Sequence, residues 1–284
     1  MASAGSGYGS IARTGNGQPQ RPSDEESSPL LGRPKDSEPS YAKRFHRHMT
    51  RDISTRRGDL LLLVCYVITG LLDSSSISIW GSFVSMQTGN TVYIGLGLSD
   101  PFGGTRWLKA LTSLGFFCMA SFIFARYHRF FSPRKRWVLF SSFVFQLFCI
   151  IGAALIITLE KTDTDAPGGE LRWQILVPIA MVAFQAGGQA VTSRALKFNA
   201  LTSVVLTSIY CDLFSDAKLF AAPTQNVERN QRMAAPICVL IGAIGGGLWS
   251  QSEVGIAGAL WTAAILKVFL VIAWLLWKSE KEED

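Results

Sequence analysis

Six stretches of about 20 mostly apolar residues dominate this sequence. The hydrocarbon core of a bilayer is about 30 Å thick, so a helix needs about 20 such residues to cross it. The period-two alternation that is typical of membrane barrels is absent from the sequence. We therefore predict an all-α integral membrane protein with about six transmembrane helices. The predicted spans are Asp59–Ile79, Trp107–Tyr127, Trp137–Leu159, Trp173–Thr192, Ala234–Gln251 and Gly255–Trp277.

Composition divides the chain into three parts. Residues 1–57 are polar and rich in Ser, Gly, Pro and Arg, which predicts a disordered cytosolic tail that ends in a basic juxtamembrane segment. Residues 58–277 form the predicted membrane domain, and residues 278–284 form a short charged C-terminus. Only 17% of the residues are charged, whereas soluble domains carry about 25%. One membrane domain with a tail fits these numbers better than two globular domains.

The net charge of +6 comes from basic residues that sit next to the predicted spans. One group lies between Tyr41 and Arg57, and a second group surrounds Pro133. Basic residues at the ends of spans are first of all signals of membrane orientation. The expected partner of this charge is therefore the lipid bilayer, and nucleic acid is not expected.

Two further segments are only moderately apolar and contain Gly, Asn, Ser, Thr and Asp. They cover residues 83–98 and 199–220. Short broken segments at membrane depth are tolerated where protein buries them or where they line a cavity. If both segments re-enter, Arg134–Arg136 lies on the same side as the N-terminal tail, as the positive-inside rule requires. If residues 83–98 cross instead, this cluster moves to the other side. We prefer six spans with both termini cytosolic, and one extra span in the second half is the main alternative.

The order of the segments recurs along the chain. Each half has one span, a broken segment and two further spans. Because three spans is an odd number, the second half would be inverted relative to the first. Inverted repeats with broken helices place binding sites near the bilayer midplane in many transporters. The alternative remains that any chain with six helices can be cut into similar halves. Within the fifth span, Gly242-x-x-x-Gly246 predicts close helix packing, for which we prefer another helix of the same chain, with dimerisation as the alternative.

Two charged residues within the spans are candidate site residues. Asp73 lies about two-thirds of the way along the first span, and Lys267 lies near the middle of the sixth. Charged groups at such depth face the bundle interior or a cavity, and they need a partner or water. We expect Asp73 to be the partner of Lys267, with Asp212 or Glu253 as alternatives. Asp73 could also carry a proton, and either residue could instead act as structural glue.

The first broken segment supplies the other candidates. Gln87, Thr88, Gly89 and Asn90 combine a glycine, which lets a ligand approach the backbone, with side chains that donate and accept hydrogen bonds. The alternative is a capped helical hairpin that packs on its neighbours. In the second half, Gln189 is the matching candidate, and Gln185, Asn199, Thr202 and Thr207 are weaker ones.

Several of these residues resemble the YoaK-like family of membrane proteins (DUF1275), a family of unknown function. The resemblance covers nearly the whole membrane domain and implies a multi-span membrane protein without implying an activity. The chain departs from the family where Leu206-Thr207-Ser208 replaces a more usual Thr-Gly. The long tail looks like a eukaryotic, fungal-type elaboration. The matching motifs are Gly70-Leu71-Leu72-Asp73, Phe83-Val84, Thr88-Gly89-Asn90-Thr91-Val92, Gly187-Gly188-Gln189-Ala190 and residues 202–208.

The tail contains two further patterns. Glu26, Leu30 and Leu31 have the spacing of an acidic dileucine sorting signal, which would bind a sorting adaptor and direct the protein to a vacuolar or other endomembrane. Chance occurrence of so short a motif is the alternative. Tyr41, Phe45, Met49 and Ile53 recur every four residues among basic residues. This spacing predicts an amphipathic helix on the anionic leaflet, or else an unstructured basic anchor.

The sequence favours a secondary transporter or channel-like carrier of a small solute. The alternative is a non-transporting scaffold or trafficking protein. A transporter would line a hydrated cavity with Asp73, Asn90 and residues near Gln189, whereas a scaffold would keep these groups dry and bonded to one another. The sequence shows no catalytic constellation, no metal-ligand cluster and no nucleotide-binding motif. We therefore expect no enzyme activity, no metal and no cofactor.

Overall fold

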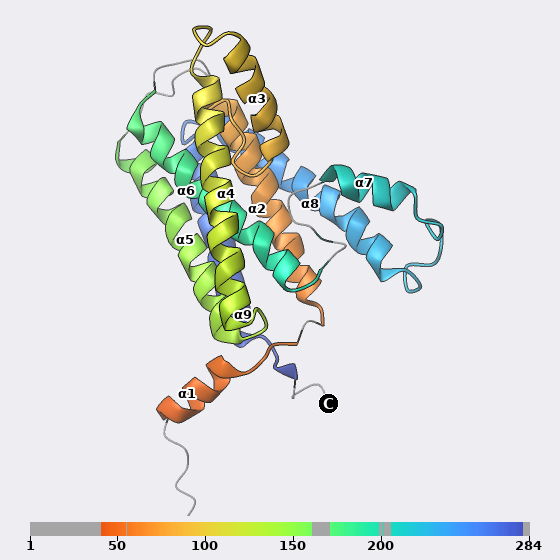
Figure 1. Ribbon diagram of the computed structural model, residues 1–284. Helices are drawn as coiled ribbons and strands as arrows, with labels where there is room; N and C mark the ends of the chain where they lie inside the picture. The colour runs from red at the N-terminus through yellow and green to blue at the C-terminus, as the bar shows by residue number, and fades with distance from the viewer. Residues whose placement is uncertain (1–40, 55, 161–170, 199–200, 202–205, 281–284) are drawn as a thin grey trace, which may run out of the picture. The chain divides into compact units, whose positions relative to one another are not determined.

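The computed structural model of the chain describes residues 41–54, 56–160, 171–198, 201 and 206–280. In this part of the chain the secondary structure is helical, and β-pairing is limited to two isolated bridges. Figure 1 shows how the helices are arranged. They are α1 (Tyr41–Thr50), α2 (Gly58–Ile79), α3 (Gln87–Ser99), α4 (Arg106–Phe131), α5 (Arg136–Leu159), α6 (Trp173–Ala195), α7 (Leu206–Phe214), α8 (Val227–Ser250) and α9 (Ile256–Leu276).

Six of these helices, α2, α4, α5, α6, α8 and α9, are long and apolar enough to cross a membrane. They confirm the predicted spans and the all-α membrane fold. The main difference is at the start of α8, which begins at Val227 rather than at the predicted Ala234. The added turns are polar, and the Asn226 side chain accepts a hydrogen bond of 3.0 Å from the backbone N–H of Arg229. Such an N-cap satisfies a free amide and lets a helix begin outside its apolar stretch.

The start of α2, the α4–α5 turn and the end of α9 meet at one end of the helices, which we call the basic end. Asp52 forms an antiparallel bridge with Lys135, and Ile53 forms one with Ser279. The cluster Arg134–Arg136 therefore lies at the same end as the juxtamembrane segment. Residues 83–98 contribute the helix α3, whose 13 residues are fewer than the about 20 that a span needs, so re-entry of this segment remains our prediction.

In the second half of the membrane domain, too, the chain leaves and returns at the basic end. The Gln231 side chain at the start of α8 donates a hydrogen bond of 2.9 Å to Asp59 at the start of α2. A Cβ atom placed on Gly58 would lie 3.1 Å from the ring of Phe198, which follows α6. The end of α6 and the start of α8 thus both lie at the basic end. In the described part of the segment between them, α7 has nine residues, fewer than the about 20 that a span needs, and six spans remain our prediction.

The short helix α3 begins deep among the other helices and returns to the end opposite the basic end, which we call the far end. After α2 the chain folds back along it, and the N–H of Val84 reaches Asp73. A Cβ atom on Gly97 would contact the side chain of Trp107 at the start of α4, so α3 finishes beside that start. Figure 1 shows α3 next to α4.

The first half of the membrane domain contains α2–α5, and the second half contains α6–α9 in matching order. Contacts between helices in one half have counterparts in the other. α2 packs on α8 and α9, and the matching helix α6 packs on α4 and α5. The short helix α3 packs on α4, as α7 packs on α8. Contact of α4 with α5 likewise matches that of α8 with α9, while α2 with α6 and α5 with α9 join matching helices. The helix α1 packs on α5 outside this pattern.

Close approach of α2 and α8 depends on glycine. A Cβ atom on Gly70 would lie 2.0 Å from the carbonyl oxygen of Val239, and one on Gly242 would lie 2.0 Å from that of Val67. Without a hydrophobic drive in lipid, such close packing is a principal source of helix association. The predicted glycine packing motif is therefore confirmed as a contact within the chain.

The basic juxtamembrane segment forms the helix α1, so the amphipathic helix is confirmed and the unstructured anchor is wrong. Tyr41 and Phe45 are exposed, whereas Ile53 lies beyond the helix and is buried. The His48 Nε2 atom is 2.9 Å from the carbonyl oxygen of Leu275 near the end of α9. The residues of the predicted apolar stripe therefore have different environments: Tyr41 and Phe45 are exposed, and Ile53 packs against the bundle. The sorting motif Glu26, Leu30 and Leu31 lies outside the described residues.

Candidate functional site

Asp73 is buried on α2, with 2% of its surface exposed, and it organises the bend that follows the helix. Its Oδ1 atom accepts hydrogen bonds from the backbone N–H groups of Val84 and Ser85, at 2.8 and 2.9 Å. Its Oδ2 atom accepts a hydrogen bond from the hydroxyl of Ser85. The bend is not helical, so its amides lack partners of their own, and the carboxylate supplies them. Asp73 thereby fixes the position from which α3 starts.

Asn90 ties the start of α3 to α4 and is fully buried. Its side-chain amide donates to the carbonyl of Phe83 at 2.8 Å and to Ser113 on α4 at 3.1 Å, while its Oδ1 accepts from the N–H of Phe83 at 3.0 Å. The Gln87 side chain also donates to Ser113, at 3.2 Å, and accepts from Asn90. Three of the predicted residues, Asp73, Gln87 and Asn90, therefore belong to one polar cluster, which we call the bend cluster.

The other two residues of the predicted motif have different environments. Thr88 is exposed and contributes no bond to the bend cluster. Gly89 faces the ring of Phe83, where a Cβ atom would lie 2.6 Å from the ring carbons. The glycine thus makes room for an aromatic side chain of the same chain.

Lys267 is completely buried near the middle of α9, and its partners are amides. The ammonium donates to the Oε1 atom of Gln189 at 2.8 Å and to that of Gln185 at 3.2 Å, both on α6. It also lies 4.9 Å from the centre of the Phe143 ring on α5, a cation–π distance. Within the described part of the chain it forms no ion pair with a carboxylate. We call these residues the lysine cluster.

Gln189 joins the lysine cluster to α2. Its side-chain N–H group donates to the carbonyl of Cys65 and to the hydroxyl of Thr69, both at 3.0 Å. Thr69 stands one helical turn before Asp73 on the same face of α2, since residues four apart lie above one another. The lysine cluster and the bend cluster are therefore neighbours along α2.

The predicted pair of Asp73 and Lys267 is wrong. The carboxylate is occupied by the bend after α2, and the ammonium by two glutamines of α6. Asp212 and Glu253, the alternative partners, are exposed residues of α7 and of the α8–α9 turn. Among the weaker candidates, Gln185 belongs to the lysine cluster, Thr207 is exposed, and Asn199 and Thr202 lie outside the described residues.

Sequence reasoning missed Thr69, Ser85, Ser113 and Phe143. The spacing of Thr69 and Asp73 carries a signal, because two polar residues four apart on an apolar helix share a face. Ser85 and Ser113 carry no such signal, because their role depends on how the bend and α4 approach α2. The polar side chains of both clusters are buried, apart from the half-buried Gln87, and they are hydrogen-bonded within the chain.

The two clusters offer two kinds of polar group, which a movement of the helices would make available. Lys267 can donate to an anionic or carbonyl group if a movement of α6 or α9 releases its glutamines. Asp73 can accept hydrogen bonds or a proton if the bend moves away. Both residues stand on helices that meet their counterparts of the other half.

Comparisons with known proteins agree with this architecture. No curated protein and no solved structure matches the chain. The family described as "Protein of unknown function (DUF1275)" matches residues 61–273, which cover all six long helices apart from their outermost turns. This multi-span membrane protein therefore belongs to the DUF1275 family.

Proposed function

We propose that the protein is a secondary transporter or channel-like carrier of a small solute, described here in a closed conformation. The observation that carries this proposal is the position of Lys267. A fully buried ammonium near the middle of a spanning helix has, among the described residues, the neutral amides of Gln185 and Gln189 as its hydrogen-bond partners. Charged groups at this depth are costly and tend to mark the paths of solutes or ions.

The matching helix contacts of the two halves also support the carrier proposal. They form the pattern expected of an inverted repeat, with α3 and α7 as the re-entrant segments. In transporters built this way, the substrate site lies at midplane where the halves meet, and access alternates by movement of one half against the other. The bend cluster includes Asp73 of α2, and Gln189 joins the lysine cluster to the same helix, which contacts α6, α8 and α9 of the other half.

A non-transporting scaffold is the second candidate. It is favoured by one observation: the polar groups of both clusters satisfy one another. Hydrogen bonds between buried groups can serve only to hold helices together. An enzyme is not proposed, and neither is a metal or another cofactor. The two candidates differ in whether the charge of Lys267 is needed once the protein is folded.

The deciding experiment replaces that charge and keeps the shape of the side chain. Cells that lack the gene would be supplied with the wild type, Lys267→Met or Asp73→Asn. Metabolite pools identify the solute, and its uptake is then measured in liposomes that contain the purified protein. The matched controls are Lys278→Met, at an exposed residue just after α9, and Glu253→Gln, at an exposed residue between α8 and α9.

We expect both site variants to lose uptake by about tenfold or more, equal to about 1.4 kcal/mol, while both controls keep it. Elution of each variant as a folded protein in detergent separates loss of function from loss of fold. Normal uptake by folded Lys267→Met, or no pool that depends on the wild type, would overturn the carrier proposal in favour of the scaffold.

We further propose that both termini are cytosolic, because the basic end carries Arg51, Arg134 and Lys135. The protein would then expose its dileucine motif to a sorting adaptor and reach a vacuolar or other endomembrane. Replacing Leu30 and Leu31 by Ala should move a fluorescently tagged protein to the cell surface. An unchanged distribution would argue against the adaptor.

A further inference from the structure

The two short helices lead into turns with the same charged residues. An aspartate follows each short helix: Asp100 after α3 and Asp216 after α7. Each following long helix has two basic residues three positions apart within its first two turns. These are Arg106 and Lys109 in α4, and Arg229 and Arg232 in α8. The two turns lie at opposite ends of the chain's helices, as expected for matching parts of an inverted arrangement.

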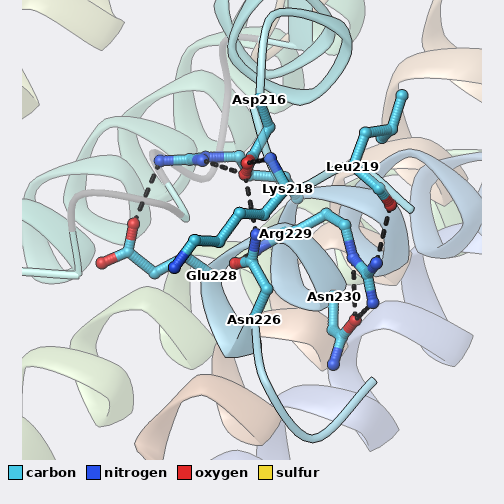
Figure 2. A network of polar contacts seen from close by, with 8 residues as sticks. Asp216, Lys218, Leu219, Asn226, Glu228, Arg229 and Asn230 are labelled. Carbon is cyan, nitrogen blue, oxygen red and sulfur yellow. Dashed lines mark hydrogen bonds and ion pairs between the residues drawn. The ribbon is translucent and has the colours of Figure 1, made fainter. Parts of the chain in front are cut away.

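The α7–α8 turn uses its charges internally, as Figure 2 shows. Asp216 forms an ion pair with Arg232 at 3.5 Å. The Arg229 guanidinium donates to the carbonyls of Leu219 and Ala221 at 2.7 and 2.6 Å, and also to the side chain of Asn230. This turn is closed by its own loop.

In the α3–α4 turn, two of the matching charges, Asp100 and Arg106, line a pocket, and Lys109 is buried. The pocket has a volume of about 230 Å³, and its lining includes Tyr93, Asp100, Arg106, Trp107 and three glycines. The Nε atom of Arg106 donates to the carbonyl of Gly81 at 2.6 Å, and its guanidinium lies 3.7 Å from the centre of the Tyr93 ring. Within the described residues, the exposed carboxylate of Asp100 forms no ion pair.

We propose that this pocket binds a small zwitterion, with its anionic group on Arg106 and its ammonium group on Asp100. Opposite charges on one pocket wall favour a ligand that carries both signs, and repel neither half of it. Trp107 also lines the pocket, and the Tyr93 ring holds the Arg106 guanidinium in place. The volume suits a headgroup or an amino-acid-sized molecule and is below that of pockets for drug-sized ligands. This inference concerns binding at the far end and holds whether or not the protein transports a solute.

Two sources offer this chemistry: a phospholipid headgroup and a free solute. The free arm uses titration calorimetry of the purified full chain with glycerophosphoethanolamine, which carries both charges. Glycerol phosphate and ethanolamine each offer one charge. The lipid arm uses native mass spectrometry of the protein released from nanodiscs of phosphatidylethanolamine or phosphatidylglycerol. The variants are Arg106→Gln and Asp100→Asn, and Arg232→Gln in the other turn is the control.

We expect the wild type to bind the zwitterionic probe about tenfold more tightly than either single-charge probe, as one charge-assisted contact allows. Asp100→Asn should bind it no better than glycerol phosphate, and Arg106→Gln no better than ethanolamine. Arg232→Gln should bind like the wild type. Asp100→Asn removes an exposed carboxylate that forms no ion pair with any described residue, so this variant keeps the test valid if Arg106→Gln does not fold.

Each outcome decides the proposal. Binding of the free probe assigns a soluble zwitterion. Retention of phosphatidylethanolamine by the wild type, lost in both variants and without binding of the free probe, assigns a lipid headgroup. If neither probe nor lipid binds the wild type, or if the folded variants bind as it does, the proposal is overturned.

Discussion

The α3–α4 turn and the α7–α8 turn carry the same charges in different arrangements. In the α7–α8 turn, Asp216 meets Arg232, and loop carbonyls cover Arg229. In the α3–α4 turn, Asp100 and Arg106 face a pocket instead. Part of the reason is the length of the connection: twelve residues separate α7 (Leu206–Phe214) from α8 (Val227–Ser250), but only six separate α3 (Gln87–Ser99) from α4 (Arg106–Phe131). The longer loop supplies the carbonyls that close its turn, and the shorter one cannot.

This difference teaches how two similar segments can take separate roles. A turn whose charges are bonded within the chain stabilises the fold. A turn whose charges face a pocket is open to an external partner. The comparison depends on three conditions. The two halves must be equivalent at their glycine contacts, and the closed turn must contribute more to stability than the open one. Asp216 must also be held as a carboxylate. Each condition can be tested by substitution.

The largest effect is expected where helices of the two halves cross. Gly70→Leu and Gly242→Leu should each prevent folding, because a Cβ atom at either position lies 2.0 Å from a carbonyl oxygen of the other helix. Gly187→Leu should do the same at the α4–α6 crossing, where the nearest oxygen is 2.6 Å away. We expect a loss of about 3 kcal/mol or more in each case. The folded yield in detergent measures it.

Gly247→Ala is the control, since no atom lies within 4 Å of its added Cβ. If Gly187→Leu folds while the other two variants fail, the crossings of the two halves differ and their equivalence is refuted.

The closed turn should respond more strongly than the open one to loss of an arginine. Arg229→Gln removes bonds to two carbonyls and to Asn230, whereas Arg106→Gln removes one to Gly81. Hydrogen bonds to charged groups contribute about 1.5–3 kcal/mol, so Arg229→Gln should lower Tm by several degrees more. Thermal unfolding in detergent compares the two variants directly. An equal or larger loss in Arg106→Gln would reverse the assignment of the structural turn.

The spans and the depth of the charged residues could be predicted from sequence because hydrophobic length and charge depend on local composition. The six long helices follow from this, and so does the central position of Lys267. The pairing of Lys267 with Asp73 could not be predicted. The bend after α2 brings two free amides to Asp73, and α6 brings two glutamines to Lys267. Both sets of partners come from elsewhere in the chain, so no local pattern reveals them.

The α3–α4 pocket illustrates the same limit. Asp100 and Arg106 are six residues apart and look like ordinary polar residues of a loop. Their importance emerges only by comparison with the α7–α8 turn, where the matching aspartate Asp216 pairs with Arg232 and loop carbonyls bind Arg229. Thr88 shows the reverse case, because it belongs to a conspicuous motif and yet lies on an exposed face. Which motif residues meet depends on the face of the helix on which each side chain lies, and the motif alone does not show that face.

The smallest effect concerns the charge of Asp216. The backbone N–H of Lys218 and the side-chain amide of Asn226 lower the pKa of this carboxyl below 3.8, and Arg232 adds to the effect. Since the folded protein has the lower pKa, the ionised carboxylate stabilises the fold at pH values above 3.8, and this contribution is lost as the pH falls through the lowered value. Asp216→Asn should therefore lower Tm slightly near neutral pH.

The difference in Tm between wild type and Asp216→Asn should stay constant from about pH 7 to pH 5 and shrink toward about pH 3. Unfolding curves of both proteins across this range provide the measurement. Asn226→Ala should weaken the dependence on pH without abolishing it, because the N–H of Lys218 still bonds the carboxylate at 2.8 Å. A difference that grows as the pH falls would mean that Asp216 is held in its protonated form, and the α7–α8 turn would then not be closed by an ion pair.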